Sequence, residues 1–311
     1  MDDFIESVES ISVIESADEL VFIKILVEKF IVLHKHDHLK RDHNECWYRV
    51  NVYSEAFDLL FLSSNLFESK RAECESVIIK TLKELKQLPT EQKNCRLDFI
   101  LESNSNDRFF EQLFCEDKPK EKKSENDIEK ADLVRSSSLK YWLTLLPYKE
   151  CSYYIESISC HFNKLTLRIY GTKLIDDRLL HYVKKETSIP NNGSGSQLAD
   201  YITTILSLFR HVLLNLKKIT VMCEIALQDD LNYLNNSTSL NTFREDSPDT
   251  DLQSSQSSQS SSDSSATKEW ETSERKGRIM NKIEAAIKDL EEADDEQYIR
   301  ACWEDLEHFQ E

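Results

Sequence analysis

Four histidines and a cysteine lie close together near residue 40. They are His34, His36, His38, His43 and Cys46. Imidazole nitrogens and thiolate sulfur are ligands that zinc prefers, and four of them can close a tetrahedral site. However, the spacing H-x-H-x-H-x4-H-x2-C is not that of a standard zinc site. The stretch also follows a predicted helix, whose C-terminal end favours histidines. We therefore predict no metal and keep a metal-binding protein that uses this cluster as an alternative.

No catalytic motif accompanies these residues. The sequence contains no GxSxG, HRD, DFG or HExxH. Its four glycines form neither a dinucleotide-binding nor a P-loop motif. Asp176 and Asp177 are a carboxylate pair, but adjacent residues are typical of a solvated turn. These observations predict a non-enzyme without a cofactor.

The charge and the cysteines restrict partners and compartment. The net charge is −18, which argues against nucleic-acid binding because phosphate contacts need a basic face. The N-terminus lacks the apolar core of a signal peptide, and no apolar stretch reaches the length of a membrane span. The eight cysteines form no CxxC pair. We expect a cytoplasmic protein with free thiols.

The residue pattern predicts an α+β body with helices packed on a sheet. Helices are expected at 19–34, 74–88, 133–146 and 198–216. Strands are expected at 47–53, 95–101, 109–115, 152–158, 164–170 and 218–227. The pair 95–101 and 109–115 is expected to form a hairpin, and 116–130 an exposed loop.

The chain divides into four parts. Residues 1–18 are an N-terminal extension, and 19–235 are the folded body. Residues 236–268 are rich in Ser, Gln and Asp and bury too little surface to fold, so a disordered linker is expected. Within it, Ser-Pro and Ser-Gln pairs mark possible phosphosites at Ser247, Ser255 and Ser258.

Residues 269–311 carry two short apolar stripes on otherwise charged helices. The stripes comprise Ile279, Ile283, Ile287 and Leu290, then Ile299, Cys302, Leu306 and Phe309. Such stripes need a surface to cover them. That surface belongs either to a partner, which we favour, or to the chain's own body.

The order of elements resembles that of the autophagy-related protein 13 family, whose members are HORMA-domain scaffolds of the autophagy-initiating kinase complex. Four patches carry the resemblance. They are FIKILVEKFIVLHKHDH, CWYRVNVYSEAFDLL, CRLDFILESNSNDRFFEQLFCE, and the strands SYYIES, KLTLRIYG and KKITVMCEIAL. The resemblance covers residues 19–230 and implies a HORMA-like fold with antiparallel or mixed strands.

The resemblance implies a non-catalytic scaffold at cytoplasmic pre-autophagosomal sites. The body would dimerise with a second HORMA protein that is like autophagy-related protein 101. The tail stripes would bind the Ser/Thr kinase, and tail phosphorylation would regulate that contact. Recruitment to membrane sites would go through partners. A spindle-checkpoint or meiotic HORMA adaptor that captures peptides is the alternative within the fold.

Trp303 to Leu306 reads Trp-Glu-Asp-Leu. This is similar to the short motif by which proteins add a strand to ubiquitin-like autophagy modifiers. The aromatic and aliphatic side chains would fill two pockets. A helix through the same residues would conflict with that use, so both interpretations stay open.

Overall fold

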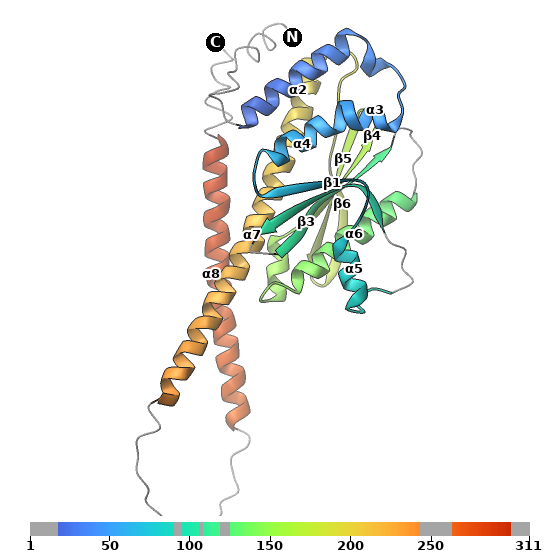
Figure 1. Ribbon diagram of the computed structural model, residues 1–311. Helices are drawn as coiled ribbons and strands as arrows, with labels where there is room; N and C mark the ends of the chain where they lie inside the picture. The colour runs from blue at the N-terminus through green and yellow to red at the C-terminus, as the bar shows by residue number, and fades with distance from the viewer. Residues whose placement is uncertain (1–17, 90–94, 106–107, 119–124, 243–262, 300–311) are drawn as a thin grey trace, which may run out of the picture.

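The computed structural model describes residues 18–89, 95–105, 108–118, 125–242 and 263–299. Its elements form a six-stranded sheet with helices on both faces (Figure 1). The helices are α2 (Asp18–Lys35), α3 (Glu45–Tyr48), α4 (Ser54–Leu62), α5 (Val77–Glu84), α6 (Glu125–Leu143), α7 (Gly195–Thr242) and α8 (Asp263–Ile299). Short helical segments are η1 (His38–Lys40), η2 (Arg49–Tyr53) and η3 (Lys149–Tyr154).

The strands follow one another in the sheet in chain order. They are β1 (Phe67–Glu75), β2 (Arg96–Ser105), β3 (Arg108–Lys118), β4 (Ser157–Asn163), β5 (Thr166–Ile175) and β6 (Arg178–Ser188). Neighbours are antiparallel except β3 and β4, which are parallel and joined by the crossover that contains α6. Parallel neighbours need such a crossover because a tight turn can only reverse the chain. The coarse α+β prediction with a mixed sheet is therefore confirmed.

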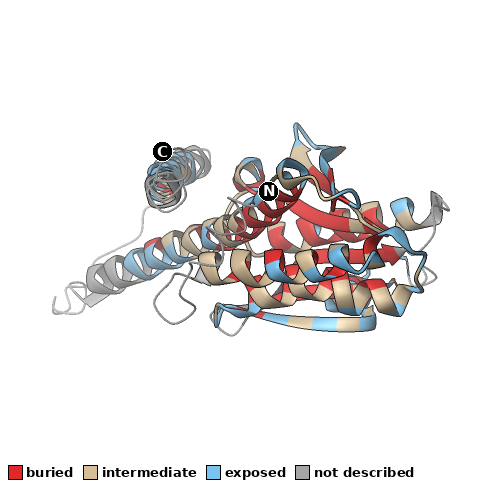
Figure 2. Ribbon diagram, turned by 90° about the horizontal axis from the view of Figure 1, so that it is seen from above, coloured by how far each residue is buried: buried red, intermediate tan, exposed pale blue. Residues whose placement is uncertain are grey.

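Alternation along the central strands directs side chains into two cores. Phe99 and Leu101 of β2 join a large cluster with α2, α4 and α7, whereas Ile100 between them joins a smaller cluster with α5 and α6. Side chains of successive strand residues point to opposite faces, so the pattern places one helix layer on each face. Figure 2 shows buried residues concentrated where helices meet the sheet. Among the described helices, none is long and apolar enough to cross a membrane.

Several predicted elements agree with the structure. The helix expected at 19–34 is α2, the 95–101 and 109–115 hairpin is β2–β3, and the 164–170 strand overlaps β5 from Thr166 onward. The Asp176–Asp177 turn is also confirmed: it joins β5 to β6, and both residues are exposed with left-handed φ values of 47° and 65°.

Two predicted strands are wrong because they are helical. Residues 47–53 belong to α3 and η2, and their buried side chains Tyr48 and Val52 continue a helical stripe into α4. Residues 218–227 lie inside α7, where Ile219 and Met222 face the core. The second correction removes the closing strand on which the fourth patch of the resemblance partly depends.

Other boundaries are shifted. Cys74 belongs to β1, so the helix predicted from 74 to 88 is the shorter α5. Parts of the loop expected at 116–130 belong to regular elements, because β3 ends at Lys118 and α6 begins at Glu125. Residues 152–154 belong to η3 and not to a strand. Strands β1 and β6 were not predicted.

Helices α7 and α8 cross each other and extend beyond the sheet (Figure 1). α7 continues to Thr242 and α8 starts at Asp263, so both enter the predicted linker. Of the predicted phosphosites, Ser247, Ser255 and Ser258 lie outside the described residues.

Candidate functional site

The two edges of the sheet differ in character. Edge strand β1 has the charged sequence FESKRAECE and an irregularity between Arg71 and Cys74, where Ala72 and Glu73 have φ values of 67° and 57°. A bulge and charged side chains protect an edge strand from further pairing. Among the described strands, edge strand β6 pairs only with β5, and it exposes most of its residues.

β6 exposes apolar side chains. Leu180 is 49% exposed and Val183 is 55% exposed. An edge strand has a row of backbone N–H and C=O groups that no neighbouring strand satisfies. An exposed edge with apolar side chains is therefore a template on which another extended segment can pair.

A hollow of about 290 Å³ lies beside β6, between this strand and α7. Its lining combines an apolar pair with polar groups: Ile169, Lys184, Lys185, Asp200, Thr203, Thr204, Ser207, Leu208 and His211. We call this hollow, together with the open edge of β6, the β6–α7 groove. The lining on α7 recurs at 200, 203, 204, 207, 208 and 211, which is the spacing of one helix face.

A buried carboxylate fixes the inner wall of the groove. The Glu156 side chain is 2% exposed. Its Oε1 accepts a 2.6 Å hydrogen bond from the Tyr182 hydroxyl, and its Oε2 lies 2.8 Å from Lys184 Nζ and 3.2 Å from His211 Nε2. Burial alone would raise the pKa of Glu156, but His211, Lys184 and Tyr182 outweigh it and lower the pKa to about 2. The carboxylate is therefore ionised at neutral pH.

Gly171 makes room for this carboxylate. A Cβ at position 171 would lie 2.1 Å from Glu156 Oε1 and 2.8 Å from Cζ of Tyr182. Gly171 is paired with Tyr182 across β5 and β6. Any larger residue at 171 would displace the carboxylate, so the glycine is a packing requirement of the site.

A second ion pair holds β6 against the start of α7. Asp200 accepts hydrogen bonds from Lys185 Nζ at 2.9 Å and from the Thr187 hydroxyl at 2.6 Å. These contacts lower the pKa of Asp200, with the Thr187 hydrogen bond the largest cause. The groove thus has fixed walls, and Lys184 and Lys185 both lie at its rim.

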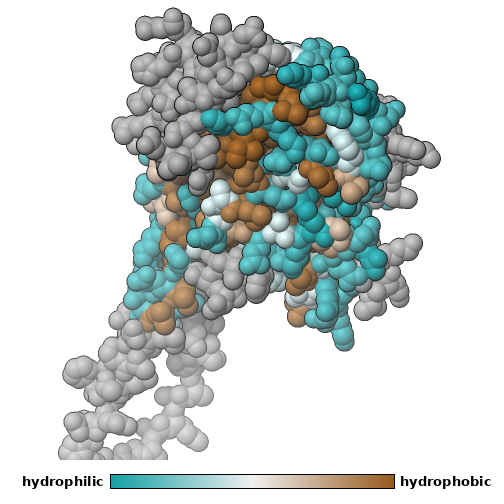
Figure 3. Space-filling view, turned by 45° about the horizontal axis from the view of Figure 1, so that its top comes forward, coloured by the Kyte–Doolittle hydropathy of each residue, from teal (hydrophilic) through white to brown (hydrophobic). Residues whose placement is uncertain are grey.

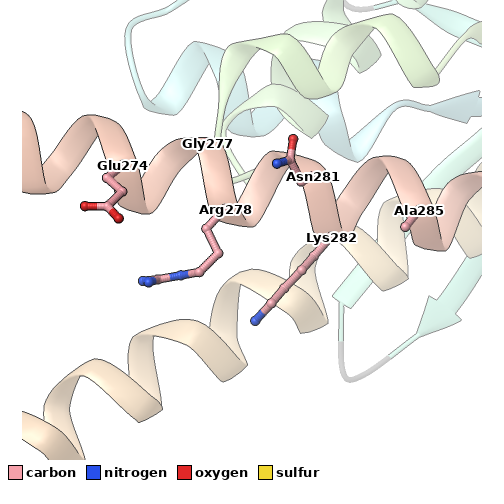
Figure 4. A pocket seen from close by; sticks show the side chains of 6 residues that line it. All are labelled: Glu274, Gly277, Arg278, Asn281, Lys282 and Ala285. Atoms are coloured by element: carbon pink, nitrogen blue, oxygen red, sulfur yellow. The ribbon is translucent and has the colours of Figure 1, made fainter.

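A second hollow borders α8. All its lining residues come from this one helix: Glu274, Gly277, Arg278, Asn281, Lys282 and Ala285 (Figure 4). Arg278 lies 3.9 Å from Asp229 of α7. No buried charged side chain lines this hollow, so it is a weaker candidate than the β6–α7 groove.

The histidine cluster is spread around the end of α2. His36 and His38 have ring centroids 6.3 Å apart, and His43 stacks on Trp47 with a centroid separation of 3.6 Å. His43 Nε2 lies 2.9 Å from the backbone oxygen of His38. In the part of the chain that the structure describes, no group of three or more His, Cys, Asp or Glu side chains could hold a metal ion.

The first predicted tail stripe packs on the chain itself. Ile279, Ile283 and Ile287 are 2%, 0% and 2% exposed and join the main core, and Leu290 is half-buried. Ion pairs flank the stripe, including Arg275 with Asp229 at 2.6 Å. This arrangement is the alternative in which the body covers the stripe. The side chain of Ile299 is not described, and Cys302, Trp303, Leu306 and Phe309 lie outside the described residues.

Two further buried charges lie away from the groove. Arg49 bridges Asp98 and Asp117, with both nitrogen–oxygen distances 2.9 Å, and burial raises the pKa of Asp117 to about 6. Glu111 of β3 accepts 2.5 Å hydrogen bonds from the Ser76 hydroxyl and the Val77 amide at the start of α5. Burial raises the pKa of Glu111 to about 7.

Hydrophilic side chains cover most of the face in Figure 3, and apolar ones gather in its upper part.

Sequence reasoning missed the groove because it missed β6. The available signal was the Asp176–Asp177 pair, which marks a hairpin turn and so implies a strand on each side.

Comparisons with known protein families, characterised proteins and solved structures find no match for this chain.

Proposed function

We propose that this chain is a non-catalytic scaffold that binds protein partners, and that one partner docks by adding a strand to β6. The observation that carries the proposal is the open, partly apolar edge of β6 beside a groove walled by α7. In strand addition, main-chain hydrogen bonds give affinity, and pockets for side chains beside the edge give specificity. The fixed Glu156–Lys184 and Asp200–Lys185 pairs pre-organise the walls, which lowers the entropy lost on binding.

We further propose that the assembly is the autophagy-initiating Ser/Thr kinase complex. This assignment comes from the family resemblance. The patches at 22–38 and 95–116 support it, whereas the strand expected at the start of the patch 46–60 and the closing strand of the fourth patch are both helical. A second HORMA protein would occupy the β6 edge. Because the first tail stripe is buried on α7, the kinase would bind the residues from Ile299 onward.

The test is co-purification of the full-length protein from cells that make it. We compare wild type with Val183→Lys on the edge strand β6, where a lysine disfavours further strand pairing, and with Val32→Lys on α2. Val183 and Val32 are 55% and 56% exposed, so the control receives the same change at matched exposure. We expect the HORMA partner with wild type and Val32→Lys but not with Val183→Lys, and the kinase with all three.

Each other outcome has a definite meaning. If all three proteins retain the HORMA partner, β6 is not its docking edge. If wild type retains neither a HORMA protein nor an autophagy-initiating kinase, the assignment to that complex is wrong.

A further inference from the structure

The side of the body formed by α2 and α4 carries an apolar surface that the chain's own N-terminal segment fits. We infer that residues 2–14 form an amphipathic helix that folds back from the start of α2 and docks on this surface. The inference concerns other elements than β6 and does not depend on the proposed strand addition. Three observations carry it: the apolar surface, the pattern of residue types in the segment, and the way the segment joins α2.

Helices α2 and α4 lie side by side and run in opposite directions (Figure 1). Lys29 of α2 and Glu55 of α4 form an ion pair at 2.7 Å, which fixes the position of one helix along the other. Both helices rise about 1.5 Å per residue. Leu62, seven residues beyond Glu55 at the end of α4, therefore lies beside the first turns of α2.

The surface between the start of α2 and the end of α4 is apolar although it faces outward. Leu62 and Leu66 are each 45% exposed, and Val21 and Ile25 of α2 are half-buried. Val21 and Ile25 lie outside the stripe that α2 buries in the main core, which comprises Phe22, Leu26, Val27, Phe30 and Leu33. Apolar side chains gather in the upper part of Figure 3, where α2 and α4 lie in Figure 1. We call Val21, Ile25, Leu62 and Leu66 the α2–α4 face.

The N-terminal segment has the residue pattern of a helix with one apolar side. Phe4, Val8 and Ile11 recur at intervals of four and three residues, which places them together on that side. The acidic side chains of the segment fall on the opposite side: Asp2, Asp3, Glu6 and Glu9. A helix of about this length is only marginally stable alone in water, so it needs a surface that covers its apolar side.

A helix start signal separates the segment from α2. Ser16 and Glu19 have the spacing of a capping box, in which a serine caps the first turn and a glutamate three residues later reaches back to it. α2 accordingly begins at Asp18. Two helices joined by a link of a few residues form an antiparallel hairpin. The apolar side of the segment therefore turns back along α2.

The length of the segment matches the α2–α4 face. As a helix, residues 2–14 span about 20 Å, which carries them along α2 from its start to about residue 30. Val8 and Ile11 then lie over the part of α2 that presents Val21 and Ile25. Val32, near the other end of α2, lies beyond the reach of the segment.

The segment is favoured over a second copy of the chain as the occupant of this face. A link of a few residues holds the segment near the face at an effective concentration in the millimolar range. A net charge of −18 opposes the association of two copies. Docking through the apolar side also leaves the acidic side chains of the segment in water, so no carboxylate is buried.

Hydrogen exchange of the full-length chain, followed by mass spectrometry, tests the inference. Two valines of the segment form a matched pair, because Val8 lies on the apolar side of the helix and Val13 on the acidic side. Val8→Asp should release the segment and speed exchange of the amides of residues 4–14 at least about tenfold over wild type. Val13→Asp makes the same change on the acidic side and should leave their exchange as in wild type.

A second pair of substitutions identifies the surface. Leu62→Asp places a carboxylate on the α2–α4 face, and Val32→Asp places one on α2 beyond the segment. Leu62 and Val32 are 45% and 56% exposed, so neither change opens a cavity in the core. We expect Leu62→Asp to speed exchange of residues 4–14 as Val8→Asp does, and Val32→Asp to leave it unchanged. Unchanged exchange in β4 and β5 controls for the fold.

Three results would overturn the inference. Fast exchange of residues 4–14 in wild type means that the segment does not dock, and equal effects of the two variants in either pair mean that it does not use this face. Protection that is lost when the wild-type protein is diluted assigns the face to a second copy. None of these results bears on β6, which is tested separately by partner loss in Val183→Lys.

Discussion

The hydroxyl of Tyr182 lies 2.6 Å from Oε1 of Glu156, across the position where Gly171 has no side chain. This contact joins the edge strand β6 to the residue just before β4. It places a buried, ionised carboxylate behind the groove, with Lys184 as its counter-charge and His211 as a neighbour. The groove therefore depends on a glycine and a carboxylate that are not themselves part of its exposed surface.

Gly171→Ala is expected to destabilise the fold. The added methyl group would meet Glu156 Oε1 at 2.1 Å, so either the carboxylate or the strand must move. Overpacking of this kind costs about 1–3 kcal/mol in the free energy of unfolding. Chemical denaturation measures the change.

Gly277→Ala is the matched control. Nothing lies within 4 Å of a Cβ at position 277 in α8. Alanine within a helix is favoured over glycine by ~0.5–1 kcal/mol, so this variant should be neutral or slightly stabilised. Equal effects of the two substitutions would show that Gly171 has no packing role.

Glu156 should make the fold sensitive to acid. Its pKa in the folded state is about 2, below the usual 4.5. Its stabilisation is therefore complete above pH 4.5 and is lost as the pH falls toward 2. Glu156→Gln should cost on the order of 3 kcal/mol at pH 7, because Lys184 loses its counter-charge. The measurement is unfolding at pH 7 and pH 3, and an equal cost at both would contradict the assignment.

The sequence predicted correctly those elements whose apolar residues recur at one clear spacing. Phe22, Leu26, Val27, Phe30 and Leu33 recur at helical spacing, and α2 buries all five. The β2–β3 hairpin was also found, because apolar runs flank a turn-rich link. Regular burial leaves a regular sequence, so such elements can be recognised without the structure.

Over a few residues, a sequence can fit both the two-residue period of a strand and the period of a helix, and the prediction then fails. Trp47 to Tyr53 alternates as a strand does, yet Tyr48, Val52 and Ala56 are also four residues apart and lie on the buried side of a helical run. β6 was missed for another reason: most of its residues are exposed, so its sequence has no apolar alternation. The Glu156–Gly171 contact joins distant positions and leaves no local signal.

Glu111 should give the opposite pH dependence from Glu156. Burial raises its pKa to about 7 from 4.5, so the folded state holds its proton more tightly than the unfolded chain does. The free energy of unfolding should fall as the pH rises from 4.5 through 7. Glu111→Gln keeps a carbonyl oxygen for the Val77 amide and carries no charge. We expect the variant to flatten this part of the profile and to be more stable than wild type at pH 8. An unchanged slope would exclude Glu111 as its source.

Ile283→Asp tests whether α8 belongs to the body. Ile283 is fully buried between α8 and the core, and a carboxylate there would have no partner among the apolar residues of the stripe. We expect α8 to separate from α7, with faster hydrogen exchange in both helices and little change in β2–β5. Ala285→Asp is the control, because position 285 is exposed on the same helix. If Ile283→Asp leaves α7 as protected as Ala285→Asp does, the stripe is free to bind a partner, as the sequence alone suggested.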